Sequence, residues 1–480
     1  MSDATDEFDV IVIGAGPTGE NAAQYAIAGS DRTAALIESE LVGGECSYWA
    51  CMPSKALLLP GALADRAGAM GGLDGTELDP AGVLERRDAF TRHWDDASQV
   101  AWATDAGIEV IRGAGRLTGE REVTVGERTL RARHAVVLAT GSEAVIPDIP
   151  GLRAARPWTN RDATALRAVP GTVLVLGGGV VACEAATWLA TLGAGVIMVV
   201  RGRSLLPAAE PFAGERVAEA LRRRGVQIRF GTELTEVTRD LPAGADPAPG
   251  APREAPATCT LSDGTELIVD EIVVAAGRRP RTDDLGLDAA GLPPGTGIEV
   301  DDQLRVRGAE DWLYACGDVN GRAALTHMGK YQARVAGDVI AARAEGRPLE
   351  GSRYAASADH GQIPQVVFTE PEVASVGPTA AAAREAGHDI AEIELDIAVA
   401  GSSLARDDYA GRAKLVIDRA TDTILGATFV GPDIAELLHA ATIAVVGKVP
   451  LETLWHAVPA YPTVSEIWLR LLERARVDRG

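Results

Sequence analysis

The chain has 480 residues, of which 46% are hydrophobic and 24% charged, with five cysteines and a formal net charge of −22. This length exceeds what one hydrophobic core usually supports, so we expect two or three domains. The acidic charge argues against nucleic acid or anionic lipid as the main partner. Met1 to Asp9 lacks the layout of a signal peptide, and no apolar run is long enough to span a bilayer. We therefore expect a cytoplasmic protein with no membrane partner, in which a working cysteine pair is more often catalytic or metal-binding than structural.

Near the N-terminus, the sequence predicts a strand, a turn, a helix and a second strand. The apolar run Phe8–Ile13 ends in the turn 14–19 (Gly-Ala-Gly-Pro-Thr-Gly), and an alanine-rich stretch then leads to Thr33–Glu38. The same order returns at 172–200, where the turn contains Gly177-Gly178-Gly179. Glycines at these positions permit the tight turn, the approach of a pyrophosphate and close packing of helix on strand, while the helix N-terminus attracts the phosphates. The sequence therefore predicts two dinucleotide-binding units.

The residue that reads the ribose is expected at the end of the second strand of each unit. In the first unit this is Glu38, and the same offset in the second unit falls on Arg201, with Arg203 as a second candidate. A carboxylate accepts hydrogen bonds from ribose hydroxyls, whereas arginine pairs with a 2′-phosphate. We therefore expect a nucleotide with a free ribose in the first unit and NADPH in the second. The alternative is that both arginines are solvated loop charges.

The remaining sequence predicts a surface loop and a third domain. Pro242 to Pro256 is rich in proline, alanine and glycine, which is typical of an inserted surface loop without chemistry. From about Pro364 the pattern changes to strands and helices without a nucleotide turn, and Asp433–Val446 has the pattern of a helix. We expect a separate C-terminal domain there.

Cys46 and Cys51 form the most informative pair in the chain. In a regular helix, residues five apart have Cα atoms about 8 to 9 Å apart, beyond the roughly 7 Å that a disulfide spans. Pro53 lacks a backbone N–H, so the turn that carries Cys51 can be distorted or can begin a helix, where a thiolate is stabilised. The alternatives are two buried, unlinked cysteines or half of a zinc site. Zinc is disfavoured because no second cysteine or histidine pair at ligand spacing lies nearby.

Together these motifs are similar to those of a known family, the flavoprotein pyridine nucleotide-disulfide oxidoreductases, which include dihydrolipoyl dehydrogenase, glutathione reductase and mercuric reductase. The resemblance runs nearly end to end. Besides both glycine turns, it covers Gly44–Lys55, Ala139–Ser142, Ala276–Pro280, Ala315–Asp318, Val367–Gly377 and Tyr461–Glu466.

The resemblance implies an α/β fold with two Rossmann-like dinucleotide-binding domains, for FAD and NAD(P), and a C-terminal α+β dimerisation domain. The expected FAD domain comprises 1–157 and 283–352, the NAD(P)H domain 158–282 and the interface domain 353–480. The resemblance also implies a homodimer and an enzyme that passes hydride from NADPH through FAD to a Cys46–Cys51 disulfide. The acceptor would be a disulfide or another small molecule.

The resemblance also assigns roles to single residues. Cys51 would contact the flavin, Cys46 would exchange with the substrate, and Lys55 would lie close to the flavin, paired with Glu184. Asp318 would lie near the ribityl chain and pyrophosphate. No metal ligand is expected. The other cofactor-binding residues expected are Gly14, Gly16, Pro17, Thr18, Gly19, Glu38, Gly44, Glu45, Gly115, Thr140, Gly141, Ser142, Gly177, Gly179, Val180, Val181, Arg201, Arg203, Gly277, Arg278, Gly317, Leu325 and Thr326.

The chain departs from the family at the general acid and base. Members that exchange thiols have a histidine before the C-terminal Pro-Thr, held by the following glutamate and facing the cysteines of the partner subunit. This chain has Tyr461 there, followed by Glu466. A phenol, with an ordinary pKa of about 10, is a poor base at neutral pH. His456 is a candidate substitute, although a structural histidine is the more common explanation of a lone residue.

Several functions remain open from the sequence. The first is an NADPH-dependent reductase that uses its dithiol on a disulfide or another acceptor. The second is a metal reductase similar to mercuric reductase, although Leu471–Gly480 contains no cysteine pair to relay metal. A third is direct reduction of a quinone or oxygen by the flavin. Dihydrolipoyl dehydrogenase is disfavoured by Arg201 and Tyr461. A redox-sensing flavoprotein is a non-enzymatic alternative.

Overall fold

The computed structural model describes residues 6–73, 77–242, 248–309 and 311–478. The chain divides into two compact units. Unit 1 comprises Met1–Pro53, Asp88–Val145 and Gly277–Asp359, and unit 2 comprises Ser54–Arg87, Ile146–Ala276 and His360–Gly480. The boundaries of the three domains expected from the sequence stay a prediction. Within the described ranges, no helix combines the length and apolar character needed to cross a membrane.

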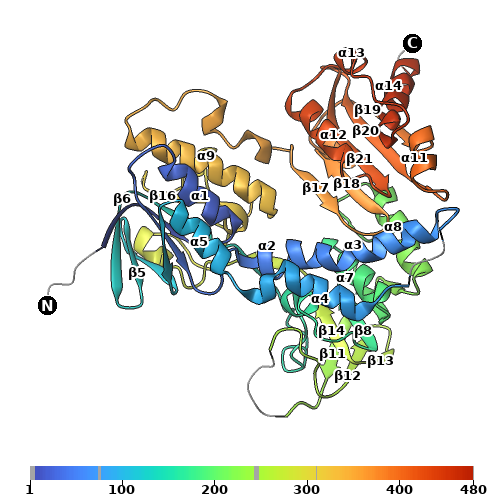
Figure 1. Cartoon of the computed structure of the whole chain (residues 1–480), viewed down its shortest axis with the longest axis horizontal. Helices are drawn as coiled ribbons and strands as arrows, with labels where there is room; N and C mark the ends of the chain where they lie inside the picture. The colour runs from blue at the N-terminus through green and yellow to red at the C-terminus, as the bar shows by residue number, and fades with distance from the viewer. Residues whose placement is uncertain (1–5, 74–76, 243–247, 310, 479–480) are drawn as a thin grey trace. The chain divides into compact units, whose positions relative to one another are not determined.

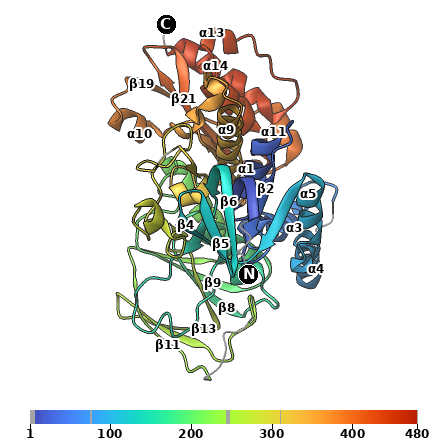
Figure 2. The same cartoon turned by 90° about the vertical axis from the view of Figure 1, so that its left-hand side faces the viewer.

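Unit 1 is built on a sheet with the strand order β3-β2-β1-β6-β5-β4, and β16 also pairs with β6. Strand β1 (Asp6–Ile13), helix α1 (Pro17–Ile27) and strand β2 (Ala34–Glu38) confirm the predicted first strand–turn–helix–strand unit. Strands β4, β5 and β6 form the antiparallel part of this sheet (Figure 2). The other bounds are β3 (Ile108–Arg112), β4 (Gly115–Gly119), β5 (Glu122–Val125), β6 (Arg128–Leu138) and β16 (Leu313–Ala315).

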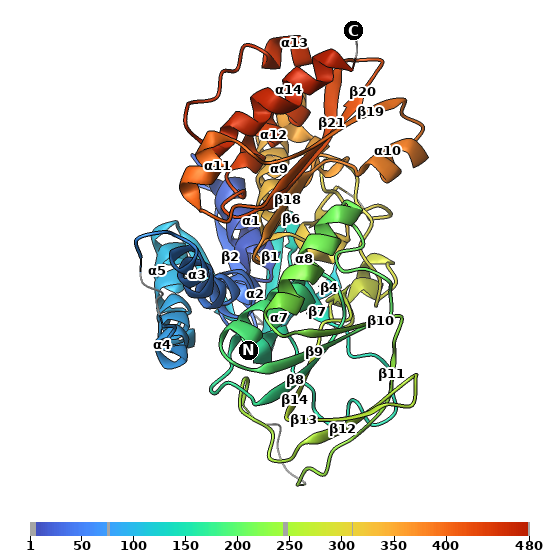
Figure 3. The ribbon, with the colours of Figure 1, turned by 90° about the vertical axis from the view of Figure 1, so that its right-hand side faces the viewer.

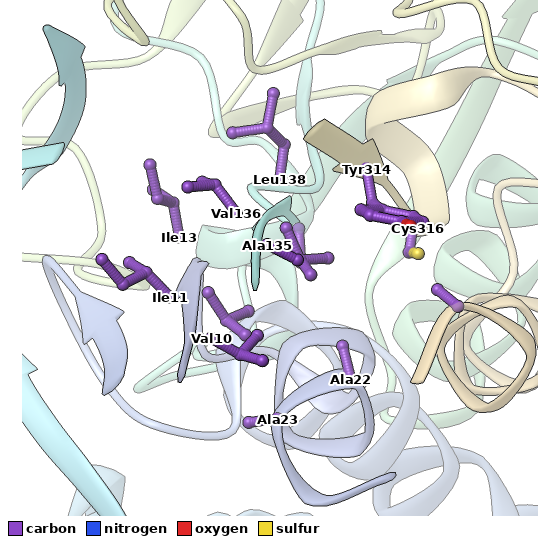
Figure 4. Close-up of a cluster of buried hydrophobic side chains, with 14 of the residues drawn as sticks. Val10, Ile11, Ile13, Ala22, Ala23, Ala135, Val136, Leu138, Tyr314 and Cys316 are labelled. Atoms are coloured by element: carbon purple, nitrogen blue, oxygen red, sulfur yellow. The ribbon is translucent and has the colours of Figure 1, made fainter. Parts of the chain in front are cut away.

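The core of unit 1 lies on both faces of this sheet, and two helices cover part of it. Successive residues of β1, such as Val10 and Ile11, are completely buried, as expected for a strand covered on both faces. Figure 4 shows Val10 beside helix α1, which presents Ala22 and Ala23 to it. Helix α9 (Thr326–Ala344) packs along α1, so a segment from the end of unit 1 covers its beginning (Figure 1).

The remaining elements of unit 1 connect these layers. A short ladder joins β7 (Ser142–Ala144) to β15 (Arg278–Pro280). Two helices are continuous across the limits of unit 1, α3 (Cys51–Gly68) and α4 (Pro80–Phe90). The other elements are α2 (Gly44–Tyr48), η1 (Arg92–Trp94), α5 (Ala97–Asp105), η2 (Leu287–Ala290), η3 (Gly317–Asn320), η4 (Ser352–Tyr354) and η5 (Ser357–Asp359).

Unit 2 contains the second predicted strand–turn–helix–strand unit. Strand β8 (Thr172–Leu176), helix α7 (Val180–Thr191) and strand β9 (Gly195–Val200) confirm it, within a parallel sheet ordered β10-β9-β8-β14. Figure 3 shows α7 and α8 beside this sheet. The other bounds are α6 (Asn160–Thr164), α8 (Pro211–Arg223), β10 (Gln227–Phe230) and β14 (Glu271–Val274), and a separate antiparallel sheet consists of β11 (Leu234–Thr238), β12 (Ala257–Leu261) and β13 (Glu266–Val269).

The C-terminal part of unit 2 is an antiparallel sheet ordered β17-β18-β21-β20-β19, with α12 (Leu437–Val446) packed on β18 and β21 (Figure 3). The predicted helix Asp433–Val446 begins four residues late, because Asp433 has φ of 55° and cannot continue a right-handed helix. The other bounds are β17 (Pro364–Val367), β18 (Glu372–Val376), α10 (Ala380–Glu385), β19 (Ile390–Asp396), α11 (Ala400–Ala405), β20 (Arg412–Asp418), β21 (Thr423–Gly431), α13 (Leu451–Leu454), η6 (Val464–Glu466) and α14 (Ile467–Val477).

The predicted surface loop Pro242–Pro256 lies partly outside the described residues, since 243–247 are not described. Its described residues, 242 and 248–256, form a turn and irregular chain without a helix or strand. Arg253 attaches this part to unit 2, because its backbone N–H donates to Glu271 and its guanidinium pairs with Asp162.

Candidate active site

The first glycine turn of unit 1 joins β1 to α1. Gly14 has φ of 100°, and a Cβ there would lie 2.4 Å from the carbonyl oxygen of Ala139. A Cβ on Gly19 would lie 1.8 Å from the carbonyl oxygen of Gly14. Gly16 differs, because the nearest atom to its Cβ position is the Cα of Gly44, 4.0 Å away. Gly14 and Gly19 are therefore required by packing, whereas Gly16 leaves open space at the N-terminus of α1.

Two carboxylates of unit 1, Glu38 and Asp318, accept hydrogen bonds from backbone and side-chain groups. Glu38, at the end of β2, accepts hydrogen bonds from the Ala15 N–H and the Glu40 N–H, both at 2.8 Å. Asp318 accepts a hydrogen bond from the Ser142 hydroxyl at 2.5 Å. Glu38 keeps acceptor capacity for ribose hydroxyls, because an ionised carboxylate has about four lone-pair sites.

The residues present fit FAD. The open space at Gly16 lies where α1 begins, and a helix N-terminus favours a pyrophosphate. Thr18, in the first turn of α1, contacts the loop that carries Asp318, since a Cβ on Gly317 would lie 2.9 Å from the Thr18 hydroxyl. A carboxylate at the end of β2, an open glycine turn and an acidic loop are therefore assembled within unit 1.

Gly16→Ala is expected to fold but to lose FAD. Its φ of −69° and ψ of 176° suit alanine, so the added methyl group would enter only the open space. We expect FAD affinity to fall by about tenfold or more, from the loss of close backbone approach. The measurement is the flavin content and the dissociation constant for FAD in reconstituted apoprotein.

Gly68→Ala is the matched control, because its Cβ position is also open and it lies at the end of α3. Equal flavin affinity in Gly16→Ala and the control, with unchanged thermal unfolding of both apoproteins, would mean that the pyrophosphate does not occupy this turn.

Cys46 and Cys51 lie on either side of a break between two helices. Helix α2 ends at Tyr48, Trp49 has φ of −139° and ψ of 4°, and helix α3 begins at Cys51. Cys51 therefore begins a helix, which is one of the two arrangements expected from Pro53. Pro53 is the third residue of α3, a position where the missing N–H leaves no intrahelical bond unmade.

The helix that carries Cys46 is attached to the first glycine turn. The Gly43 N–H donates to the Ala15 carbonyl at 2.7 Å, and a Cβ on Gly44 would lie 2.8 Å from the Cα of Gly16. Since Gly44 begins α2, these contacts fix the start of that helix against the predicted pyrophosphate position. Glu45 faces two cations of unit 1, Arg278 at 3.9 Å and Arg281 at 3.8 Å.

The two thiols interact with each other and with the start of α9. A hydrogen bond with Cys51 is the largest cause that raises the pKa of the Cys46 thiol, and burial acts in the same direction. Thr326 and Lys330 act in the opposite direction, the first by hydrogen bonding and the second by its charge. The Thr326 hydroxyl also lies 3.2 Å from the Cys51 sulfur. The dithiol is therefore held on one side by the first turn of α9.

Lys55 and Glu184 form an ion pair within unit 2, with 2.8 Å between Nζ and Oε2. Glu184 is buried, and its other oxygen accepts the Phe368 backbone N–H at 3.0 Å. The Lys55 ammonium also lies 4.7 Å from the centroid of the Phe368 ring, a cation–π contact. Two other segments of unit 2 thus hold the lysine, and the predicted pairing of Lys55 with Glu184 is present.

The second glycine turn, in unit 2, has the geometry of the first. Gly177 has φ of 132°, Gly179 is the N-cap of α7, and the space at the Gly179 Cβ position is open. Arg201 and Arg203 follow β9 and are exposed. Among the described residues, neither guanidinium has an ion-pair or hydrogen-bond partner. Both are therefore available to a ligand phosphate.

The C-terminal motif places Tyr461, Glu466 and His456 in different environments. Tyr461 is 77% exposed, and its hydroxyl has no hydrogen-bond partner among the residues that the structure describes. Glu466 is buried, and one of its oxygens accepts the N–H groups of Thr463 and Gly401. His456 is exposed after α13. Glu466 thus holds backbone within its own subunit.

The site residues predicted from the sequence are divided between the two units. Unit 1 contains both cysteines and the expected FAD-binding residues, while unit 2 contains the nicotinamide-nucleotide set, Lys55, Glu184 and the C-terminal motif. Several predicted residues have structural contacts of their own: Gly115 packs on Ile13 and Ile37, and the Thr140 hydroxyl donates to the Arg281 carbonyl. The remaining predicted positions are Pro17, Gly141, Gly277 and Leu325 in unit 1 and Val180 and Val181 in unit 2.

Sequence reasoning missed four contributors to these arrangements. It did not predict that Thr326 contacts the cysteines, and it assigned no role to Lys330, Glu20 or Phe368. Phe368 stands in a motif that the resemblance covered, so its position could have been noted. Lys330 and Glu20 carry no such signal, because their proximity depends on how α9 packs on α1.

The other three cysteines are buried in the fold. Cys183, Cys259 and Cys316 are fully buried, consistent with packing roles. Within 6–73, 77–242, 248–309 and 311–478, no group of three or more His, Cys, Asp or Glu side chains could hold a metal ion.

Comparison with known proteins identifies the family. Residues 8–333 match the model described as pyridine nucleotide-disulphide oxidoreductase, and residues 363–471 match the dimerisation domain of the same family. The fold is therefore α/β, with FAD-binding and NAD(P)-binding domains and a C-terminal dimerisation domain.

Similar proteins cover nearly the whole chain. A dihydrolipoyl dehydrogenase from Chlorobaculum parvum is 33% identical over 474 residues, covering 96% of this chain and 95% of its own length. A mercuric reductase from Staphylococcus aureus is 26% identical over 473 residues, covering 96% and 81%. The Cu(II) complex of the HOCl-induced flavoprotein disulfide reductase RclA from Escherichia coli has a TM-score of 0.82 at 23% identity, covering 98% of this chain and 100% of that one, and supports the fold. The chain belongs to the pyridine nucleotide-disulphide oxidoreductase family and is an FAD-dependent, NAD(P)H-dependent flavoenzyme.

Proposed function

We propose that this enzyme uses NADPH to reduce a disulfide acceptor through Cys46 and Cys51. The observation that carries the proposal is the thiol pair: the two side chains hydrogen-bond across a helix break that is attached to the first glycine turn. Two adjacent sulfurs at the start of a helix form the arrangement needed for reversible disulfide chemistry.

The dithiol reaction balances in two exchange steps. The Cys46 thiol loses a proton, and its thiolate attacks one sulfur of the acceptor disulfide, whose second sulfur leaves as a thiolate and takes up a proton. The Cys51 thiol loses its proton and attacks the Cys46 sulfur of the mixed disulfide. This releases the second acceptor thiolate, which is protonated in turn, and closes the Cys46–Cys51 disulfide. Two electrons and two protons reach the acceptor.

FAD, when bound, supplies the redox centre that accepts the electron pair of NADPH and returns the Cys46–Cys51 disulfide to the dithiol. Glu38 and the turn 14–19 would hold its nucleotide part, with Asp318 near its ribityl chain. Lys55, oriented by Glu184, would place a positive charge near the flavin ring.

Arg201 and Arg203 support NADPH over NADH. Both are exposed after β9 and unpartnered among the described residues, and guanidinium forks suit a 2′-phosphate. The dihydrolipoyl dehydrogenases similar to this chain make that activity the first competitor. Arg201 and Tyr461 both argue against it here.

The dimerisation domain points to a homodimer. In our proposal, Tyr461 and Glu466 of one subunit face the partner subunit's Cys46, and His456 is a further candidate proton donor. Because Glu466 already holds two backbone N–H groups, Tyr461 is left to orient the substrate through its exposed ring and hydroxyl.

Reduction of a soft metal ion is a second candidate, favoured by Tyr461. A metal ion needs no protonated leaving thiol, so the missing histidine would be no handicap, and thiolates are soft ligands. The similarity to a mercuric reductase adds support. We rank this candidate second, because exchange with a disulfide acceptor already accounts for the two adjacent thiols.

The test is NADPH oxidation by the purified holoenzyme with lipoamide, glutathione disulfide, mercuric ion and a quinone, each repeated with NADH. Disulfide-dependent turnover with NADPH preferred supports the first proposal, and turnover with mercuric ion alone supports the second. Quinone turnover that survives Cys46→Ser would contradict both, because it would bypass the dithiol.

A further inference from the structure

The start of α9 lies at the dithiol and places a lysine there. The Thr326 hydroxyl contacts Cys51, and it also hydrogen-bonds with Cys46. Lys330 follows Thr326 by four residues in the same helix. Residues four apart lie on one helix face, with Cβ atoms about 5–6 Å apart. Because helical side chains lean toward the N-terminus, Lys330 leans back over Thr326 and toward the two sulfurs.

Helix α9 can come this close to α1 because of Gly329. A Cβ at that position would lie 2.2 Å from the Thr18 hydroxyl and 3.4 Å from the Cα of Gly317. Lys330 follows Gly329 in α9, and Glu20 lies two residues after Thr18 in α1. The same contact therefore brings the lysine and this glutamate into electrostatic range.

The charge of Lys330 acts on two groups of unit 1. Like the Thr326 hydrogen bond, it lowers the pKa of the Cys46 thiol against the effects of Cys51 and burial, and it favours ionisation of Glu20. Lys330 is half-buried, and among the described residues its ammonium forms neither an ion pair nor a hydrogen bond. A half-buried cation beside an exchanging thiol is therefore not neutralised by direct contact with a carboxylate.

We propose that Lys330 supplies the positive charge that stabilises the Cys46 thiolate during exchange, in place of the absent histidine, and that Glu20 moderates this effect. The proposal rests on the function proposed above and identifies a residue of the same site. Lys330 acts through its field, as a positioning and electrostatic residue, and transfers no proton itself.

The effect of Glu20 on the field of Lys330 depends on pH. Burial raises the pKa of Glu20 to about 7, with Lys330 opposing this shift and Glu38 adding to it. Well below pH 7 the Glu20 carboxyl is neutral, and the field of Lys330 acts on the thiol undiminished. Above pH 7 Glu20 is ionised, and its negative charge offsets part of that field. Among the described residues, the charges of Cys51 from α3 and Lys330 from α9 act on Cys46, and Lys330, Glu38 and Tyr48 lie in electrostatic range of Glu20.

The test is the pH dependence of Cys46 alkylation by iodoacetamide in the dithiothreitol-reduced holoenzyme, with mass spectrometry separating Cys46 from Cys51. Lys330→Met is expected to raise the pH midpoint by about one unit and to slow alkylation at pH 7 about tenfold, since a nearby opposite charge shifts a thiol by one unit or more. Lys330→Arg should stay within about twofold of wild type, because it keeps the charge.

Glu20→Gln adds an independent readout. It is expected to leave alkylation at pH 6 unchanged and to speed it about twofold at pH 8, where the native carboxylate is charged. Lys448→Met, which removes one exposed charge from unit 2, is the control for net charge. The flavin spectrum reports folding, and Lys330→Gln provides a second neutral variant.

An alkylation profile that is the same in wild type, Lys330→Met and Lys330→Gln would overturn the inference while leaving the dithiol function intact. A wild-type enzyme in which NADPH never makes Cys46 reactive would instead refute the proposed function itself. The two failures are therefore distinguishable.

Discussion

Replacing either Cys46 or Cys51 with serine is expected to abolish disulfide reduction while leaving reduction of the bound flavin by NADPH in place. Serine cannot form or exchange a disulfide, so turnover with a disulfide acceptor should fall by about 10³-fold or more, as for loss of a covalent nucleophile. NADPH should still bleach the flavin absorbance, because Lys55, Glu184 and the second glycine turn remain. The measurement is anaerobic stopped-flow absorbance beside steady-state turnover.

The two variants should differ spectroscopically. Cys46→Ser retains the sulfur expected beside the flavin, so a long-wavelength thiolate-to-flavin band should persist, whereas Cys51→Ser should lack it. Cys259→Ala is the matched control, because this cysteine is fully buried in β12. Retained disulfide reduction in Cys46→Ser would refute the assigned order of the sulfurs and the proposed function.

Removing both Arg201 and Arg203 should change the coenzyme preference from NADPH to NADH. Each charge-assisted guanidinium–phosphate contact is worth about 1.5–3 kcal/mol, so loss of both contacts in the double alanine variant should lower kcat/KM for NADPH by about 10²–10⁴-fold. The value for NADH should change by less than about threefold, since that coenzyme has no phosphate for the arginines to contact. Steady-state kinetics with both coenzymes and a fixed acceptor measure this.

Arg223→Ala is the control, because Arg223 is also exposed, on α8 of the same unit. A loss shared equally by NADPH and NADH would point to local misfolding. Unchanged kinetics with NADPH would mean that the arginines are solvated loop charges, the alternative left open by the sequence.

The sequence predicted both nucleotide-binding folds because their signals are local. The apolar runs, the glycines and the residue at the end of each second strand stand within about thirty residues of one another. The helix break between the cysteines was also local, since it followed from their spacing and from Pro53. By contrast, the helix predicted from Asp433 starts at Leu437, because apolar periodicity does not reveal the positive φ of Asp433.

The contacts at the dithiol could not be predicted in this way. Cys51 and Thr326 are 275 residues apart, and their contact depends on the packing of α9 against α1. The resemblance assigned Thr326 to the cofactor only, and nothing in the local sequence distinguishes Lys330 from a surface lysine. The use of Glu466 to hold the Gly401 N–H is likewise a tertiary contact between distant segments.

The pairing of β16 with β6 has a consequence for biosynthesis. Residues 313–315 pair with Val136–Leu138 on the side of β6 away from β1, so this end of β6 lacks a partner on that side until the ribosome has passed Ala315. Residues 146–276, which belong to the other unit, emerge in the meantime and can collapse on their own sheet first. Nascent chains that terminate before residue 313 would expose an apolar strand edge, which is prone to aggregation. Stop codons or stalls in this interval should therefore yield insoluble, colourless fragments, in contrast to a yellow full-length product.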